Sequence, residues 1–139
     1  MYVREYQLKD ATYLFNINKS CFSSPEPNLN LLENIHKGQT WVCCTEKDDK
    51  PVGFLVSTYQ NGAHVYNVAV DPEFRNKGIA TSLFKEFHYF YREQHYAWLH
   101  VDTSNPAQKL YFDLGYRIKE IKYDYYGPGK DAYVMVKEF

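Results

Sequence analysis

The sequence lacks several features that define large classes of protein. It has only three cysteines, Cys21, Cys43 and Cys44, which form neither a C-x-x-C pair nor a pattern with histidine. This spacing excludes the common zinc-site patterns, so we expect reduced thiols and no metal. The sequence also has no long apolar run, and no basic leader precedes an apolar stretch. We therefore expect a cytoplasmic protein that makes no contact with a membrane.

The chain also lacks an excess of charge of either sign. Its formal net charge is −1, which gives no electrostatic basis for binding nucleic acid. No repeat, low-complexity tract or Pro/Gly-rich linker divides it, so we expect one domain over residues 1–139. We expect that domain to be a monomer or a homodimer.

Apolar periodicity and turn residues predict a regular succession of strands and helices. Strands are expected over Tyr2–Tyr6, Thr40–Thr45, Pro51–Tyr59, Ala63–Val70, Ala97–Val101, Arg117–Tyr125 and Ala132–Lys137. Helices are expected over Ala11–Cys21, Asn28–His36, Gly78–Glu93 and Pro106–Leu114, with Asp10 capping the first. The order β-α-α-β-β-β-α-β-α-β-β predicts an α/β protein with a single mixed β-sheet and helices on both faces.

The most informative segment of the chain joins a strand to the longest predicted helix. The apolar strand ends at Asp71-Pro72, and Gly78 then opens the helix. The first turn of a helix has unpaired N–H groups and partial positive charge, and a glycine lets a phosphate approach the backbone. Arg75 and Lys77 add positive charge beside it. The segment therefore predicts a pyrophosphate cradle, although it has neither the Walker A spacing nor G-x-G-x-x-G.

Arg75-x-x-Gly78-x-Ala80, preceded by Val68–Pro72, resembles the [QR]-x-x-G-x-[GA] motif with which GNAT N-acetyltransferases bind acetyl-CoA. The alternative is an ordinary basic turn. The resemblance covers the whole chain and implies the GNAT fold, in which two neighbouring strands splay apart to form an acyl-CoA cleft. It implies that the strand backbone pairs with the pantetheine arm and that the helix start wraps the pyrophosphate. The implied cofactor-binding residues are Val68, Ala69, Val70, Arg75, Asn76, Lys77, Gly78, Ile79 and Ala80.

Acetyl transfer to an amine requires a proton donor for the departing thiolate, and Tyr111 is the candidate. The run from Ala107 to Tyr116 resembles the GNAT segment A-x-x-L-Y-x-x-x-G-[FY], whose tyrosine commonly acts as general acid. A phenol stays protonated at neutral pH and can therefore donate. The alternative is an aromatic on the core side of an amphipathic helix. Asn105 resembles the family asparagine that contacts the CoA arm, although its spacing to Tyr111 is one residue short.

The same reaction requires a base for the amine, and His100 is the candidate. Leu99–Asn105 resembles the L-[EH]-V-x-x-S-N segment of protein N-terminal acetyltransferases, in which the Glu or His acts as base. Strand alternation places His100 and Asp102 on one face. The alternatives are a solvent-exposed histidine without a role, or His64 or Tyr66 as the base. We expect Tyr66 to contact the substrate.

The end of the chain carries a second resemblance. Lys122–Met135 resembles the N-Y-Y-x(n)-D-A-x-x-M ending of ribosomal-protein alanine acetyltransferases and eukaryotic N-terminal acetyltransferases, although Asp124 replaces the asparagine. In those enzymes the tyrosine pair covers the peptide N-terminus, so the resemblance implies that Tyr125 and Tyr126 bind substrate. The alternative is a plain edge hairpin.

Three functions are compatible with these patterns. The first is an acetyl-CoA-dependent N-acetyltransferase acting on a protein N-terminal α-amine or a lysine. The second is an acetyltransferase for a small amine such as a polyamine, amino acid, antibiotic or toxin-like amine. The third is a regulatory module that binds acyl-CoA without turnover. The acidic residues are scattered, which disfavours a polyamine, and the presence of Tyr111 argues against the third function.

Overall fold

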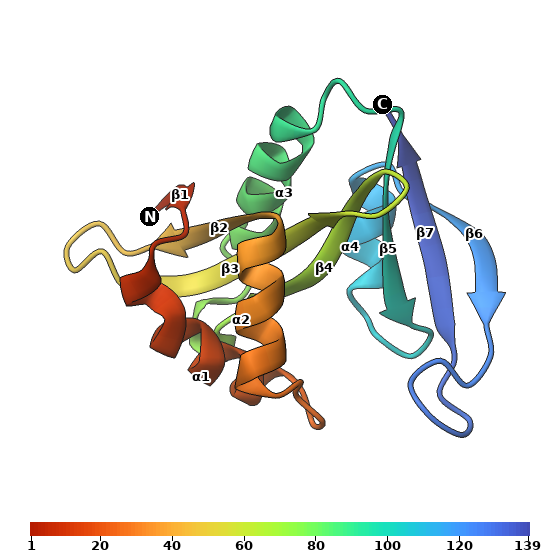
Figure 1. The fold of residues 1–139 in the computed structure, drawn as a ribbon, viewed down its shortest axis with the longest axis horizontal. Coiled ribbons are helices and arrows are strands. Elements are labelled where there is room, and N and C mark those ends of the chain that lie inside the picture. Colours follow the sequence, from red (N-terminus) through yellow and green to blue (C-terminus); the bar gives the residue numbers. More distant parts are fainter. The chain divides into compact units, whose positions relative to one another are not determined.

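Seven strands form one mixed sheet in the computed structural model, which describes residues 1–139 (Figure 1). Their order is β1-β2-β3-β4-β5-β7-β6. Strands β4 and β5 are parallel, whereas the pairs β1–β2, β2–β3, β5–β7 and β6–β7 are antiparallel. The chain divides into two compact units: Met1–Thr58 with Tyr66–Phe90 (unit 1), and Tyr59–Val65 with Tyr91–Phe139 (unit 2). Strand β4 contributes residues to both.

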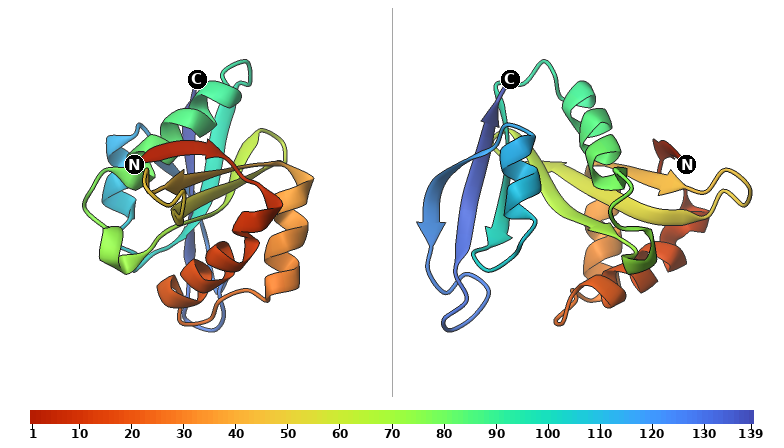
Figure 2. Two further views of the ribbon diagram at one scale, coloured as in Figure 1. Left: turned by 90° about the vertical axis from the view of Figure 1, so that its left-hand side faces the viewer. Right: turned by 180° about the vertical axis from the view of Figure 1, so that it is seen from behind.

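Unit 1 is a sheet covered by helices on both faces. Helices α1 and α2 lie on one face and α3 lies on the other (Figure 2). Because both faces are covered, β3 is buried along nearly its whole length, as expected for a central strand. The strands of this unit are β1 (Tyr2–Glu5), β2 (Gln39–Cys44), β3 (Pro51–Tyr59) up to Thr58, and the part of β4 (Ala63–Val70) that begins at Tyr66. The helices are α1 (Ala11–Cys21), α2 (Asn28–Lys37) and α3 (Ile79–Phe90), with short 3-10 turns η1 (Leu8–Asp10) and η2 (Pro72–Phe74).

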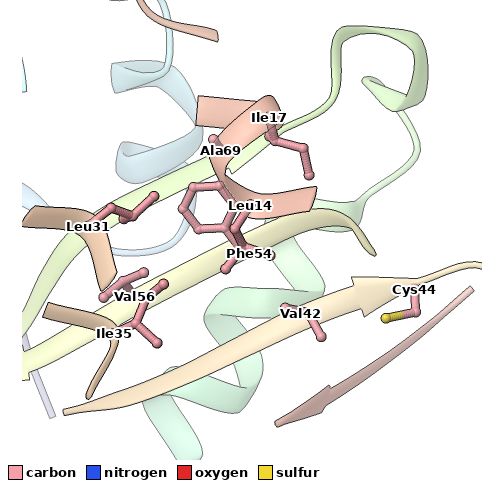
Figure 3. Close-up of a cluster of buried hydrophobic side chains, with 9 residues drawn as sticks. All are labelled: Leu14, Ile17, Leu31, Ile35, Val42, Cys44, Phe54, Val56 and Ala69. Carbon is pink, nitrogen blue, oxygen red and sulfur yellow. The ribbon is translucent and has the colours of Figure 1, made fainter. Parts of the chain in front are cut away.

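The main core of unit 1 lies beneath α1 and α2 (Figure 3). It consists of Leu14, Ile17, Leu31, Ile35, Val42, Cys44, Phe54, Val56 and Ala69. Alternate residues of β2 point to the opposite face, where Trp41 meets Phe87 and Phe90 of α3 edge-on, with ring centroids 6.3 and 5.5 Å apart. The two-residue period of the strand thus supplies both layers of the core.

The prediction that Asp10 caps helix α1 is wrong. Its carboxylate accepts from the Gln7 N–H at 2.8 Å and from two guanidinium nitrogens of Arg4 at 2.8 and 2.9 Å. The cause is the 3-10 turn η1, which holds the Asp10 backbone in the helical region (φ −84°, ψ −15°) and directs its side chain backward. Asp10 is 1% exposed and the Arg4 side chain 16%, so this ion pair is largely buried, and it ties β1 to the start of α1.

Unit 2 is built around strand β5 (Tyr96–Asp102), with helix α4 (Gln108–Asp113) over one face of β5 and β7 (Figure 2). Strand β7 (Ala132–Glu138) pairs with β5 on one side and with β6 (Arg117–Lys122) on the other. Burial alternates along β5, with Ala97, Leu99 and Val101 buried and the residues between them half-buried. Strand alternation therefore gives β5 a core face and a partly open face.

The fold class and the predicted order of elements are confirmed. The largest difference is in the helix predicted over Gly78–Glu93, which spans Ile79–Phe90. The predicted strand Arg117–Tyr125 also ends early, at Lys122. Asp124 adopts a left-handed conformation (φ 56°), and its carboxylate accepts from the Gly129 N–H at 2.7 Å, which turns the chain early. None of the helices combines the length and the apolar character that a membrane crossing requires.

Candidate functional site

The predicted pyrophosphate cradle lies at the end of β4, in unit 1. Asp71 accepts from the Glu73 N–H at 3.0 Å and fixes the η2 turn, after which Gly78 takes a left-handed conformation (φ 75°). A Cβ built at Gly78 meets no atom within 4 Å, so the space beside this backbone is open. The N–H of Ser82 closes the first turn of α3 on the Gly78 carbonyl at 3.1 Å. The N–H groups of the preceding helical residues have no partner within the helix. This geometry fits an anion.

Arg75 lies against the end of β4. Its Nε donates to the Val70 carbonyl at 3.3 Å, and its Nη2 donates to Cys21 Sγ at 3.3 Å. Cys21 Sγ in turn donates to the same carbonyl at 3.2 Å. The positive charge of Arg75 is therefore held beside the strand end that precedes the cradle. Lys77 and Ile79 instead border a separate hollow of about 500 Å³, which α3 lines together with residues of β1 and β2.

A polar cluster lies near the middle of β4 and joins it to the loop between α1 and α2. Glu26 Oε1 accepts from the Tyr66 hydroxyl at 2.8 Å, and Glu26 Oε2 accepts from Asn67 Nδ2 at 3.3 Å. Asn18, which is buried, donates its Nδ2 to the Glu26 carbonyl at 3.3 Å. Burial raises the pKa of the Glu26 carboxyl, and the hydrogen bonds from Tyr66 and Asn67 oppose that rise. Glu26 is thus a half-buried carboxylate held by hydrogen bonds.

Sequence reasoning did not identify Glu26. The one local signal is its position between two prolines, Pro25 and Pro27, which stiffen the loop around a single acidic residue. Tyr66, the predicted substrate contact, is the residue that brings Glu26 to β4.

His100 lies on the half-buried face of β5, in unit 2. The ring of Tyr125 stacks on it with centroids 4.3 Å apart, and Trp98 meets it edge-on at 5.2 Å. Burial, followed by the positive charge of Lys122, lowers the pKa of His100, so the imidazole is neutral at neutral pH. The rival base His64 is more deeply buried, at 7% exposure, and burial and His100 lower its pKa to about 4. His100 is the more accessible imidazole.

Tyr111 projects from α4 into the interior of unit 2. It is 7% exposed, and its ring meets Tyr116 edge-on with centroids 6.3 Å apart. Burial raises the pKa of Tyr111 to about 12, so the phenol carries its proton at every physiological pH. A side chain in this form can donate a proton but cannot accept one as a base.

The hairpin between β6 and β7 carries Tyr125 and Tyr126. Their rings meet edge-on at 4.9 Å. Burial raises the pKa of Tyr126 to about 12, and the negative charge of Asp102, with those that Tyr125 and Tyr111 would carry when ionised, acts in the same direction. Tyr126 thus lies in the electrostatic range of Tyr111 and of the tyrosine that stacks on His100. Unit 2 brings these predicted site residues into one neighbourhood.

Asn105 has a local structural role in the turn before α4. Its Oδ1 accepts from the Ala107 N–H at 2.9 Å, and Ser104 donates both its N–H and its hydroxyl to Asp102 at 2.8 and 2.7 Å. These bonds fix the turn that leads from β5 to Tyr111. No three His, Cys, Asp or Glu side chains are grouped in a way that could hold a metal ion.

Comparison with known proteins gives consistent matches along the chain. Residues 9–116 match the acetyltransferase (GNAT) family. An N-terminal acetyltransferase complex ARD1 subunit homolog of Dictyostelium discoideum is 33% identical over 96% of this chain and 71% of its own. A ribosomal-protein bS18 alanine N-acetyltransferase of Haemophilus ducreyi is 30% identical over 91% of this chain and 92% of its own. The crystal structure of Ard1 from Thermoplasma volcanium superposes with a TM-score of 0.91 at 24% identity, covering 99% of this chain and 96% of that one. The chain belongs to the acetyltransferase (GNAT) family.

Proposed function

We propose that this chain, acting as one domain over residues 1–139, transfers the acetyl group of acetyl-CoA to the α-amine of a protein N-terminus. The observation that carries the proposal is the open space beside the Gly78 backbone at the start of α3, flanked by Arg75. The relatives from Dictyostelium and Haemophilus, named as an N-terminal and a ribosomal-protein alanine acetyltransferase, support the choice of a protein substrate.

The residues of the β4–α3 junction fit acetyl-CoA. The backbone of Arg75–Ala80 would hold the pyrophosphate, because a side chain at position 78 would occupy the space that the phosphate needs. The backbone of Val68–Val70 would pair with the pantetheine arm. When bound, acetyl-CoA supplies the activated thioester. Asn105 remains a proposed contact to the arm, made from a turn that its own side chain stabilises.

His100 would accept the proton of the substrate amine. An α-ammonium group loses its proton near pH 8, and only the neutral amine can attack the thioester carbonyl. The lowered pKa of His100 keeps its imidazole in the proton-accepting form at neutral pH. Glu26 is a second candidate for this role, because its carboxylate is half-buried and anchored to β4 by Tyr66 and Asn67.

Tyr111 would donate the proton that the departing thiolate requires. Its phenol is protonated, and its burial excludes water that would compete for the proton. Tyr125 and Tyr126 would line the entrance for the peptide, since each offers a large ring with a hydroxyl at its tip.

The direct test is a thiol-release assay with acetyl-CoA and three sets of acceptors. These are peptides with free N-termini, the same peptides with blocked N-termini and an internal lysine, and small amines. We expect the free N-termini to have the highest kcat/KM. A preference for small amines would favour the second function. Acetyl-CoA binding without turnover on any acceptor would favour the regulatory module.

The same assay separates the two candidate bases. His100→Gln should remove the dependence of kcat/KM on pH that a titrating base produces, whereas Glu26→Gln should leave that dependence in place and raise KM. The reverse result would assign the base to Glu26 and leave the acetyltransferase proposal intact.

A further inference from the structure

A groove of about 350 Å³ begins on the half-buried face of β5 and extends across β7 to β6, entirely within unit 2. We call it the β5 groove. Its lining residues are Asn61, Tyr96, Trp98, His100, Lys119, Glu120, Lys122, Val134 and Val136. The antiparallel register sets Trp98 opposite Val136 and His100 opposite Val134, so an aromatic row and an aliphatic row form its floor side by side. The candidate base His100 belongs to the aromatic row of this floor.

The floor of the groove is held in place. The Trp98 indole N–H donates to the Gln60 carbonyl at 2.8 Å, and His64 packs against the same indole at a centroid distance of 4.1 Å. Trp98 therefore presents a fixed apolar surface, which is suited to the backbone and aliphatic side chains of an extended peptide.

A β-bulge in β6 brings an additional cation to the rim. The register shifts between Ile118, which is opposite Met135, and Glu120, which is opposite Val134, so Lys119 is the extra residue. Successive residues of a regular strand point to opposite faces, yet Lys119 and Glu120 both line the groove. The bulge accounts for this, because bulges redirect side chains.

The rim carries a net positive charge. Lys122 pairs with Glu120 at 3.5 Å, so their opposite charges largely offset each other for a ligand at the rim. Lys119 makes no ion pair and is exposed, so its charge is available to a ligand. A carboxylate on the ligand is the complement of this rim.

We propose that the β5 groove binds the segment of the substrate that follows the acetylated residue, and that Lys119 selects an acidic side chain there. The proposal rests on the proposed function, because it sets the reacting amine at the His100 end of the groove.

Lys119 lies two strands away from β5, about 10 Å across the sheet at roughly 4.8 Å per strand. An extended peptide covers that distance in about three residues at roughly 3.3 Å each, so the acidic side chain is the third or fourth of the substrate.

The test uses peptides that share their first two residues and differ at positions three and four, where they carry Glu, Gln or Lys. With the wild type, we expect kcat/KM to be about two- to fivefold higher for the Glu peptide than for the Gln peptide. The difference should arise from a lower KM for the Glu peptide, and it should become smaller as the salt concentration rises. Lys119→Gln should remove this preference, and Lys119→Glu should transfer it to the Lys peptide. Lys47→Glu, the same charge change at an exposed position in unit 1, should leave it unchanged.

Binding is measured separately through Trp98 fluorescence, with Trp98→Phe to isolate its signal from that of the buried Trp41. If no peptide is acetylated, the proposed function fails, while tighter and Lys119-dependent binding of the Glu peptide would still support the groove. If peptides are acetylated without regard to Glu or Gln, or if the preference persists in Lys119→Gln, the groove proposal is overturned and the proposed function remains.

Discussion

The imidazole of His100 lies face to face with the phenol ring of Tyr125, with centroids 4.3 Å apart and planes 14° from parallel. This contact covers one face of the candidate base and contributes to the burial that lowers its pKa. Tyr125, which we propose to bind substrate, therefore also contributes to the lowered pKa of His100, the proposed base.

Tyr125→Ala should raise the pKa of His100 toward the ordinary histidine value of about 6.5, because water would regain access to the ring. Titration of the imidazole by NMR measures the shift directly. In the wild type, kcat/KM should rise with pH through an apparent pKa below that ordinary value, and the rise should move upward in Tyr125→Ala. Tyr123→Ala, on the same hairpin but 76% exposed, is the matched control and should leave the pKa unchanged. An unshifted His100 in Tyr125→Ala would contradict this account.

Gly78→Glu should abolish acetyl-CoA binding, because it introduces a side chain and a negative charge where the phosphates must lie. Gly129→Glu is a close control. Gly129 has φ 74° against 75° at Gly78, and a Cβ at either position meets no atom within 4 Å. Both variants should lose about 1 kcal/mol of unfolding free energy through the strained backbone. Calorimetric titration should detect lost binding only in Gly78→Glu, and equal binding by both variants would remove the cradle assignment.

Tyr111→Phe should lower kcat by about 10²- to 10⁴-fold while the Kd for acetyl-CoA stays nearly constant, since the ring remains and only the proton-donating hydroxyl is lost. Because the pKa of Tyr111 is raised to about 12, the wild-type rate should show no descending limb near pH 10, where an ordinary phenol ionises. Tyr116→Phe removes a hydroxyl from the neighbouring buried ring and should change stability more than kcat. Equal turnover by Tyr111→Phe and wild type would leave Tyr111 as a core aromatic.

Much of the fold could be predicted because its signals are local. The Gly-Ile-Ala start of α3 and the alternation along β5 each depend on residues adjacent in the chain, and both are confirmed. The capping role of Asp10 was wrong because its carboxylate meets Arg4, a contact that arises only when η1 forms.

The candidate site was harder to predict, because its contacts join residues that are far apart in the sequence. Glu26 reaches Tyr66 across 40 residues, and Trp98 reaches Gln60 across 38, so neither contact leaves a pattern in a short window. Lys119 illustrates a further limit. Its place on the groove depends on a bulge, and strict two-residue alternation would assign it to the other face. Family motifs selected His100 and Tyr111 as candidates, but the neighbours that shift their pKa values come from the fold.

The buried ion pair of Arg4 with Asp10 should be the most sensitive polar contact of unit 1. Arg4→Gln leaves the Asp10 carboxylate 1% exposed without its cation, and we expect a loss of about 3 kcal/mol of unfolding free energy.

Arg4 also pairs with Asp49 at 3.0 Å, and together with neighbouring hydrogen bonds this lowers the pKa of the Asp49 carboxyl. A lowered folded pKa stabilises the protein above the unfolded value, near pH 4, and that contribution is lost as pH falls toward the folded value. Urea unfolding at pH 7 and at acidic pH should therefore show a smaller difference between wild type and Arg4→Gln at the acidic pH. Lys37→Gln, which breaks only the exposed pair with Glu33, should cost less than about 0.5 kcal/mol at either pH. Equal losses for the two variants would mean that Arg4 contributes no more than a surface charge.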